Sequence, residues 1–185
     1  MLRVGLSGTN WTGKTETINR LTGICSIGPV RTISLSSLVA KCPYPMMENQ
    51  TIDGSKWMVE QVKGIFRSSN GEIEIFDRTP VDILAFTLYA LERTGEHDEG
   101  VLDDCVELLR HFDRVFYLPP SEDWPVVVCP TESQIRFARQ MDVYIRRAVK
   151  EFSVEIETLP WEFEERQRLL SEFLSVGALV CKGGL

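Results

Sequence analysis

The segment from residue 8 to residue 15 constrains the fold of this chain most, because it matches the pattern G-x-x-x-x-G-K-S/T at every fixed position. An apolar run at residues 2–6 precedes it and a helical pattern follows, which is the context that this motif requires. Its glycines let backbone N–H groups turn toward phosphate oxygens at the positive end of the next helix. The sequence therefore predicts a loop that binds a nucleoside triphosphate through Gly8, Thr9, Asn10, Trp11, Thr12, Gly13, Lys14 and Thr15.

Two side chains at the end of this loop supply a charge and a metal ligand. The ammonium group of Lys14 can reach the β- and γ-phosphates, and the hydroxyl of Thr15 can bind Mg²⁺. We therefore expect ATP and Mg²⁺ as the cofactors of this chain.

Short apolar runs alternate with helical periodicity along the chain, which is typical of βαβ units. Strands are expected at residues 2–6, 30–35, 73–76, 115–118 and 154–159. Helices are expected at residues 14–21, 55–68, 79–93, 101–112, 133–152 and 161–176, and a loop at 41–54. The prediction is a three-layer α/β fold of the P-loop NTPase type, with a five-stranded parallel sheet of order 2-3-1-4-5 and helices on both faces. Residues 1–185 fit a single domain of this type.

Charge and composition restrict the binding partners and the cellular compartment that we expect for the chain. The formal net charge of −7 disfavours a nucleic-acid-binding surface. No apolar run approaches the roughly 20 residues of a membrane-spanning helix, and the first expected strand leaves no room for a targeting peptide. The five cysteines are scattered, as is typical of reduced thiols. We expect a cytoplasmic protein that binds neither nucleic acid nor membrane, and its oligomeric state stays open, a homodimer included.

A second motif follows the strand expected at residues 73–76. Asp77 ends this strand, and ligands of open α/β sheets gather at the carboxyl ends of strands. An acidic residue there can hold Mg²⁺ beside a phosphate-binding loop. Arg78 can offer two parallel donors to a substrate oxygen or phosphate. The alternative is a loop carboxylate beside a surface charge, and the upstream loop favours the site.

The run Asp77-Arg78-Thr79-Pro80-x-Asp82, followed by Ala85-Phe86, resembles the Asp-Arg-Ser/Thr motif of the nucleoside and nucleotide kinase group of P-loop proteins. That group includes thymidylate kinases, deoxynucleoside kinases and nicotinamide riboside kinase-like proteins. The run is most similar to the last of these, as is Thr12-Gly13-Lys14-Thr15. The resemblance covers the order of elements over most of the chain, and its specific motifs occupy about twenty residues. It implies that Asp77 supports Mg²⁺ or deprotonates the acceptor, and that Arg78 holds the substrate.

The chain departs from this group at two places. Trp11 is bulky for the loop crest, where thymidylate kinases commonly carry an acidic residue. Deoxynucleoside kinases usually carry a glutamate base near the end of the second strand, where this chain has Ser34, Leu35 and Ser36. Glu48, further on, is a candidate for a substitute base or sugar contact, with a solvated loop carboxylate as the alternative.

Asp82 has two interpretations. With Thr79 and Pro80 it forms a T-x-x-D capping pattern at the start of a helix, and that structural role is sufficient by itself. The other interpretation is a contact with the substrate, and the sequence favours neither.

Basic residues concentrate between residues 136 and 150 of this otherwise acidic chain. In the kinase group that the chain resembles, a lid after the fourth strand carries arginines onto the transferring phosphoryl group, whose transition state spreads negative charge. We predict a lid-like segment around residues 119–140, with Arg136 and Arg139 as its arginines. For Arg146, Arg147 and Lys150 the pattern favours a solvated helix face.

These features together predict an ATP- and Mg²⁺-dependent kinase that acts on a small nucleoside, nucleoside monophosphate or nicotinamide riboside-like acceptor. The alternative is a nucleotide-binding switch or regulatory P-loop ATPase that acts through a protein partner. The N-K-x-D and D-x-x-G motifs of a guanine-specific GTPase do not occur in the sequence. The predicted catalytic residues are Lys14, Asp77, Arg78, Arg136 and Arg139, the substrate contacts are Arg78, Asp82 and Glu48, and the metal ligands are Thr15 and Asp77.

Overall fold

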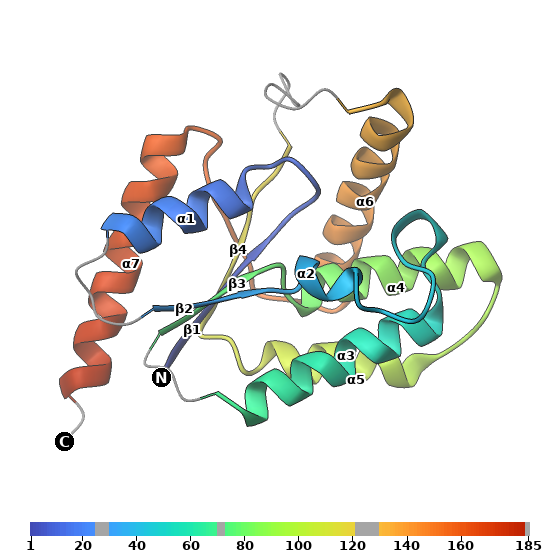
Figure 1. Cartoon of the computed structure of the whole chain (residues 1–185), viewed down its shortest axis with the longest axis horizontal. Coiled ribbons are helices and arrows are strands. Elements are labelled where there is room, and N and C mark those ends of the chain that lie inside the picture. The colour runs from blue at the N-terminus through green and yellow to red at the C-terminus, as the bar shows by residue number, and fades with distance from the viewer. Residues whose placement is uncertain (25–29, 70–72, 121–129, 184–185) are drawn as a thin grey trace.

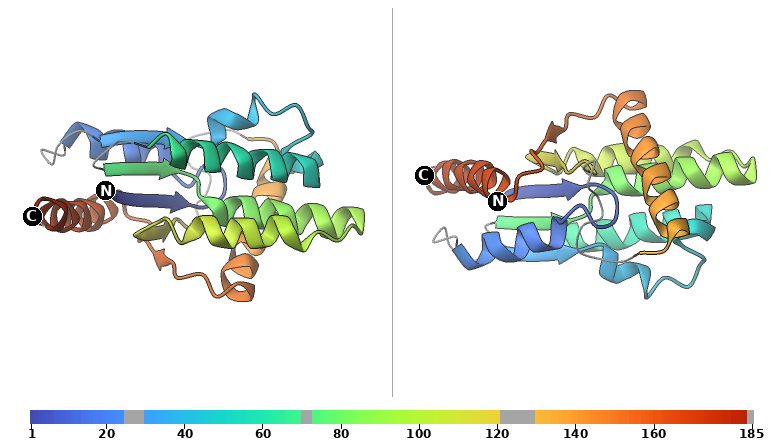
Figure 2. Two further views of the ribbon diagram at one scale, coloured as in Figure 1. Left: turned by 90° about the horizontal axis from the view of Figure 1, so that it is seen from below. Right: turned by 90° about the horizontal axis from the view of Figure 1, so that it is seen from above.

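A parallel five-stranded sheet forms the centre of the computed structural model, which describes residues 1–24, 30–69, 73–120 and 130–183. The strand order is β2-β3-β1-β4-β5, as predicted, and every strand pair is parallel. The strand arrows of Figure 2 accordingly run in one direction. The strands are β1 (Leu2–Ser7), β2 (Val30–Ser34), β3 (Ile73–Asp77), β4 (Arg114–Tyr117) and β5 (Glu157–Thr158).

Helices cover both faces of the sheet, which confirms the predicted three-layer fold (Figure 1). On one side lie α1 (Lys14–Ile24) and α7 (Phe163–Gly183). On the other lie α3 (Ile52–Arg67), α4 (Pro80–Thr94), α5 (Glu99–Leu109) and α6 (Glu132–Glu151), and the short elements α2 (Ser36–Val39) and η1 (Met47–Asn49) follow β2. Among the described residues, no helix combines the length and apolarity that crossing a bilayer demands.

The central strand is buried on both of its faces. All six residues of β1 are buried, and alternate side chains of a strand point to opposite faces. Leu2, Val4 and Leu6 pack in the core beneath α1 and α7, whereas Phe76 of β3 packs in the core on the opposite face. This double burial is typical of parallel sheets.

Several element boundaries differ from the predictions. The segment 41–54 is not a loop throughout, because η1 lies within it and α3 begins at Ile52, capped by the Thr51 side chain. Helix α5 begins at Glu99 because Asp98 caps it. Strand β5 is limited to Glu157–Thr158, the two residues that pair with Phe116 and Tyr117 of β4.

A buried charge network lies on the sheet face opposite α1. Arg3 and Glu74 face each other across β1 and β3, 3% and 0% exposed, with a nitrogen–oxygen distance of 2.9 Å. The second carboxylate oxygen of Glu74 accepts from Arg31 at 3.0 Å and from the Ser69 hydroxyl at 2.7 Å. The Arg3 guanidinium also stacks on the Phe66 ring. Each buried charge therefore depends on its partners for compensation.

The Glu74→Ala change should lower the free energy of unfolding by about 3–5 kcal/mol, because it leaves the Arg3 charge buried and unpaired. Urea denaturation measures this difference. Glu107→Ala is the matched control, because its pair with Arg110 is exposed on both sides, and it should cost less than about 1 kcal/mol. Equal effects of the two changes would contradict a structural role for the buried pair.

Candidate active site

The phosphate-binding loop connects β1 to α1 and has the backbone conformation that its glycines permit. Gly8 has φ +146° and Gly13 has φ +84°. A Cβ atom on Gly8 would lie 2.5 Å from the carbonyl oxygen of Leu118, so any larger residue would displace the backbone just after β4. Trp11, at the crest, is also left-handed with φ +63° and lines the cavity above the loop.

The side chain of Lys14 is folded into this loop. Its Nζ donates to the carbonyl oxygens of Gly8 at 2.8 Å and Thr9 at 2.6 Å, and to the Thr12 hydroxyl at 3.3 Å. Burial, assisted by the nearby charge of Arg78, lowers the pKa of Lys14 from 10.5 to about 7. The ammonium charge is therefore held at the place where phosphate oxygens would neutralise it.

Thr15 and Asp77 form the second polar pair of the site. Parallel pairing places Asp77 opposite Leu6, next to the loop, and the Thr15 hydroxyl donates to Asp77 Oδ2 at 2.7 Å. Asp77 Oδ1 is buried and accepts no hydrogen bond from the described residues. A buried carboxylate oxygen without a donor, beside a hydroxyl, fits a divalent cation that takes oxygen ligands.

Arg78 connects the loop to the opposite wall of the site. Its Nε donates to Ser36 Oγ at 2.9 Å, and its Nη2 donates to Asn10 Oδ1. Its backbone is left-handed, with φ +75°, a strained conformation that is common at functional sites. The half-buried guanidinium thus spans from the loop crest to α2.

Asp82 is a buried carboxylate that accepts hydrogen bonds from the loop and from Arg78. Its Oδ2 accepts from the Ser7 hydroxyl at 2.8 Å and from the Thr79 N–H at 2.9 Å, which completes the capping box of α4. Its Oδ1 accepts from the Gly8 N–H at 3.3 Å and from Arg78 at 3.2 Å. All these bonds are internal, so the structure accounts for Asp82 without a ligand.

A cavity of about 810 Å³ opens above the loop. Asp77 and Arg78 line it together with the loop, as the sequence predicts for a common site. Sequence reasoning missed another part of the lining, which is formed by Arg20 of α1 and by Trp161, Phe163 and Arg166 around the start of α7.

A signal for Arg166 does exist in the sequence. Arg166, Leu170 and Leu174 recur every four residues, and all three are buried. A charged residue within the apolar stripe of a helix indicates a specific buried partner.

A second, smaller cavity adjoins the first. Its volume is about 40 Å³, and Arg78 lines both cavities. Thr79 and Asp82 border it, and its other lining residues are mostly apolar: Leu35, Val39, Met46, Met47, Gln50, Met58, Ile83 and Phe86.

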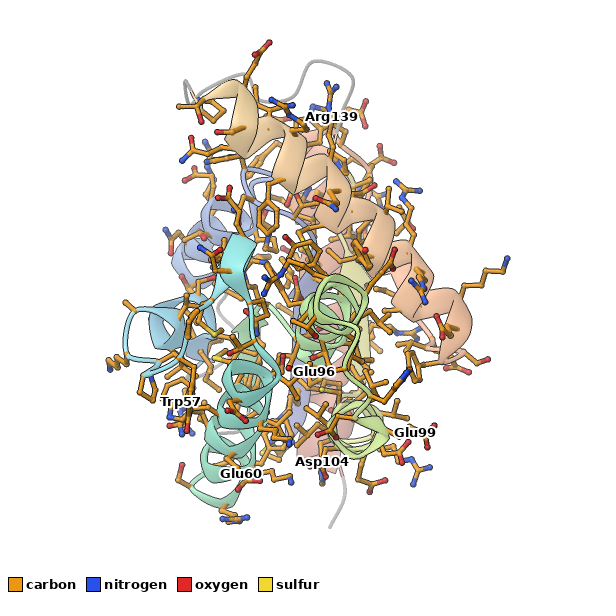
Figure 3. The ribbon with its side chains drawn as sticks, turned by 90° about the vertical axis from the view of Figure 1, so that its right-hand side faces the viewer. Trp57, Glu60, Glu96, Glu99, Asp104 and Arg139 are labelled. Atoms are coloured by element: carbon orange, nitrogen blue, oxygen red, sulfur yellow. The ribbon has the colours of Figure 1, made fainter. Side chains whose placement is uncertain are left out.

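Three predicted site residues lie apart from these cavities. Glu48 is an exposed residue of η1, and neither lining includes it. Arg136 and Arg139 are exposed on the first turns of α6, where they line a separate cavity of about 340 Å³ with Glu132 and Ile135. Figure 3 shows Arg139 on α6, well separated from the acidic side chains of α3 and α5. Of the lid-like segment 119–140, residues 121–129 lie outside the described part of the chain.

Comparisons with known proteins support the fold. No protein-family model matches the chain, and no curated protein matches it by sequence. Similar solved structures include thymidylate kinase from Candida albicans, with TM-score 0.62, 13% identity and coverage of 95% of this chain and 91% of that one.

Two further structures show the same likeness. Deoxyadenosine kinase from M. mycoides, solved with dCMP and dCDP, has TM-score 0.59, 14% identity and coverage of 95% and 100%. The YorR protein of Bacillus subtilis, in complex with phosphorylated GDP, has TM-score 0.61, 11% identity and coverage of 94% and 96%. At these identities the likeness establishes the fold.

The pKa of Lys14 predicts how phosphate binding depends on pH. Phosphate favours the ammonium form, so the bound state has the higher Lys14 pKa and takes up a proton. Affinity for inorganic tripolyphosphate with Mg²⁺ should therefore fall as pH rises above about 7, by up to about tenfold per pH unit.

Isothermal titration calorimetry between about pH 7 and pH 9 measures this dependence. Lys14→Arg is the control, because its guanidinium stays charged over the range and the titration of the ligand is the same. Parallel pH profiles for the two proteins would contradict the assignment to Lys14.

Proposed function

We propose that this chain is a phosphotransferase that moves the γ-phosphoryl group of ATP to a small nucleoside or nucleotide. The observation that carries the proposal is the place of Arg78, which lines both the cavity of the phosphate-binding loop and the adjoining apolar cavity. A guanidinium shared by two cavities can hold a donor phosphate and an acceptor oxygen together, and phosphoryl transfer depends chiefly on such positioning.

The donor side has separate features for phosphates and for a base. Loop N–H groups, Lys14 and the start of α1 would bind the phosphates. The flat rings of Trp161 and Phe163 line the same cavity. The Arg20 guanidinium lies over the Phe163 ring, 4.3 Å from its centroid. Aromatic and guanidinium planes of this kind suit a stacked purine.

Thr15 and Asp77 would hold Mg²⁺ by their side-chain oxygens. The ion supplies positive charge that neutralises the phosphates, and it ordinarily keeps water and phosphate oxygens as its other ligands. Arg78, and Lys14 once it is protonated, would add positive charge beside the same phosphates.

The second cavity would have to enlarge before it could hold an acceptor. A volume of about 40 Å³ is far below the roughly 300 Å³ of small ligand sites. Met46 and Met47 lie against it, and Met47 has a left-handed φ of +62°. Methionine side chains repack easily. We therefore assign the cavity to the base of the acceptor, a nicotinamide riboside-like ring included, after the segment around η1 opens.

The solved structures lend support on the acceptor class. The similar enzymes are named as a thymidylate kinase and a deoxyadenosine kinase, and the latter was solved with nucleotide products. The names of both enzymes indicate that they act on small nucleosides or nucleotides. The apolar lining of the second cavity in this chain suits the flat base of such a compound.

The direct test is ADP release from ATP and Mg²⁺ with a panel of nucleosides, nucleoside monophosphates and nicotinamide riboside. An acceptor in the panel should raise ADP release above basal hydrolysis, with phosphorylated acceptor as the second product. Slow hydrolysis that no acceptor alters would favour a regulatory nucleotide-binding protein and refute the proposal. Arg78→Met should lower the acceptor-dependent rate, whereas Arg110→Met, at an exposed position, should not.

Asp77→Asn should lower that acceptor-dependent rate by about a hundredfold or more, because an amide is a poor Mg²⁺ ligand and cannot accept a proton. A Mg²⁺ titration of the rate measures both turnover and metal dependence. Asp103→Asn makes the same charge change at an exposed site on α5 and is the control. Unchanged turnover in Asp77→Asn would remove Asp77 from the site.

A further inference from the structure

Arg166, near the start of α7, is a deeply buried cation. Its side chain is 2% exposed, and among the described residues it has no carboxylate within ion-pair distance. Burial lowers its pKa, while Glu162 acts in the opposite direction. A buried charge without a paired carboxylate is costly, so a residue of this kind needs another compensation.

The compensation comes from oxygen atoms in three different segments. Nη1 donates to the Thr12 carbonyl of the loop and to the Thr17 hydroxyl of α1, both at 3.1 Å. Nε and Nη2 donate to the carbonyl oxygens of Pro160 at 3.2 Å and Trp161 at 3.1 Å. One guanidinium thus joins the loop, helix α1 and the segment of Pro160 and Trp161 that precedes α7.

These bonds act on the shape of the loop itself. A trans peptide directs its C=O and N–H in opposite directions, so the bond to the Thr12 carbonyl also fixes the orientation of the Gly13 N–H. The Thr17 hydroxyl donates to the Gly13 carbonyl at 2.8 Å, and the Gln167 amide donates to the Thr17 carbonyl at 2.9 Å. Arg166 also lines the 810 Å³ cavity.

We propose that Arg166 is a positioning residue of the phosphate-binding loop, which holds the loop backbone in its anion-binding shape and adds positive charge to the cavity wall. The proposal rests on the proposed function, because it takes a polyphosphate as the ligand of the loop. The phosphates complete the charge compensation that the buried guanidinium lacks in the protein.

The test compares the affinity for inorganic tripolyphosphate with Mg²⁺, a probe without a base, in the wild-type chain and in R166M, R166K and R168M. Arg168 lies two residues further on α7, is exposed, and pairs with Glu172, so R168M makes the same charge change away from the loop. Titration calorimetry below the melting temperature of each variant gives the dissociation constants.

We expect R166M to weaken tripolyphosphate binding at least tenfold, R166K about threefold because lysine keeps the charge and loses the fork, and R168M less than twofold. A folded R166M with a lower melting temperature and an unchanged dissociation constant would show a merely structural role and overturn the proposal. If R166M does not fold, R166K decides, and wild-type affinity in R166K overturns the proposal.

The two proposals fail in different ways. A wild-type chain that binds neither tripolyphosphate nor ATP would refute the nucleotide site, and the role of Arg166 with it. Tight wild-type binding that R166M leaves unchanged would refute the role of Arg166 alone.

Discussion

The site depends most on the carboxylate of Asp82. Five donors converge on it: the hydroxyls of Ser7 and Thr79, the N–H groups of Gly8 and Thr79, and the guanidinium of Arg78. The Ser7 and Gly8 donors belong to the end of β1 and the start of the loop, and the others to the segment that joins β3 to α4. One buried carboxylate therefore connects two segments that are distant in the sequence, since Gly8 and Asp82 are 74 residues apart. Arg78 also bonds directly to Asn10 of the loop, so Asp82 reinforces a link between the loop and Arg78 that the guanidinium makes as well.

The cationic side chains at the loop are also positioned in advance of any ligand, and Lys14, whose pKa is about 7, would become fully charged when phosphate binds. Lys14 and Arg166 are buried, and burial lowers the pKa of each. Backbone oxygens accept most of their hydrogen bonds. This arrangement costs free energy in the ligand-free protein and returns it when an anion binds, which is electrostatic preorganisation. Asp77 shows the converse, a buried acceptor oxygen to which none of the described residues donates a hydrogen bond.

Sequence reasoning predicted the features that short-range patterns determine. The loop motif and the alternation of elements predicted the three-layer fold and the meeting of Asp77 and Arg78 with the loop, and the strand order followed from the P-loop fold class that the motif indicates. Parallel pairing alone places Asp77 beside the end of β1, because carboxyl ends of neighbouring strands share one edge. The roles of the individual side chains as substrate or metal contacts stay predictions.

The features that the sequence did not predict depend on long-range contacts. Arg166 lies 154 residues from Thr12, and no local pattern shows which oxygen atoms it binds. Its position in the apolar stripe with Leu170 and Leu174 shows only that it is buried. By contrast, Arg146 and Arg147 bear out the expected solvated helix face, because they pair with Asp142 and Glu151 one turn away.

The two halves of the site differ in how far they are formed. The cavity that we propose for the donor has a volume of about 810 Å³ and charged lining residues, whereas the one that we propose for the acceptor is a space of about 40 Å³ whose lining includes methionine side chains. Tyr89 donates to the Glu48 carbonyl and Arg93 to the Gln50 carbonyl, so two bonds from α4 hold the closing segment. An acceptor must break or shift these contacts, and its binding free energy is reduced by that cost. At the loop the cavity of about 810 Å³ is already open, and a donor phosphate would only replace the bonds that Lys14 makes to loop oxygens. We infer that the nucleotide binds more readily to the ligand-free chain than the acceptor does, and that movement around η1 governs acceptor entry.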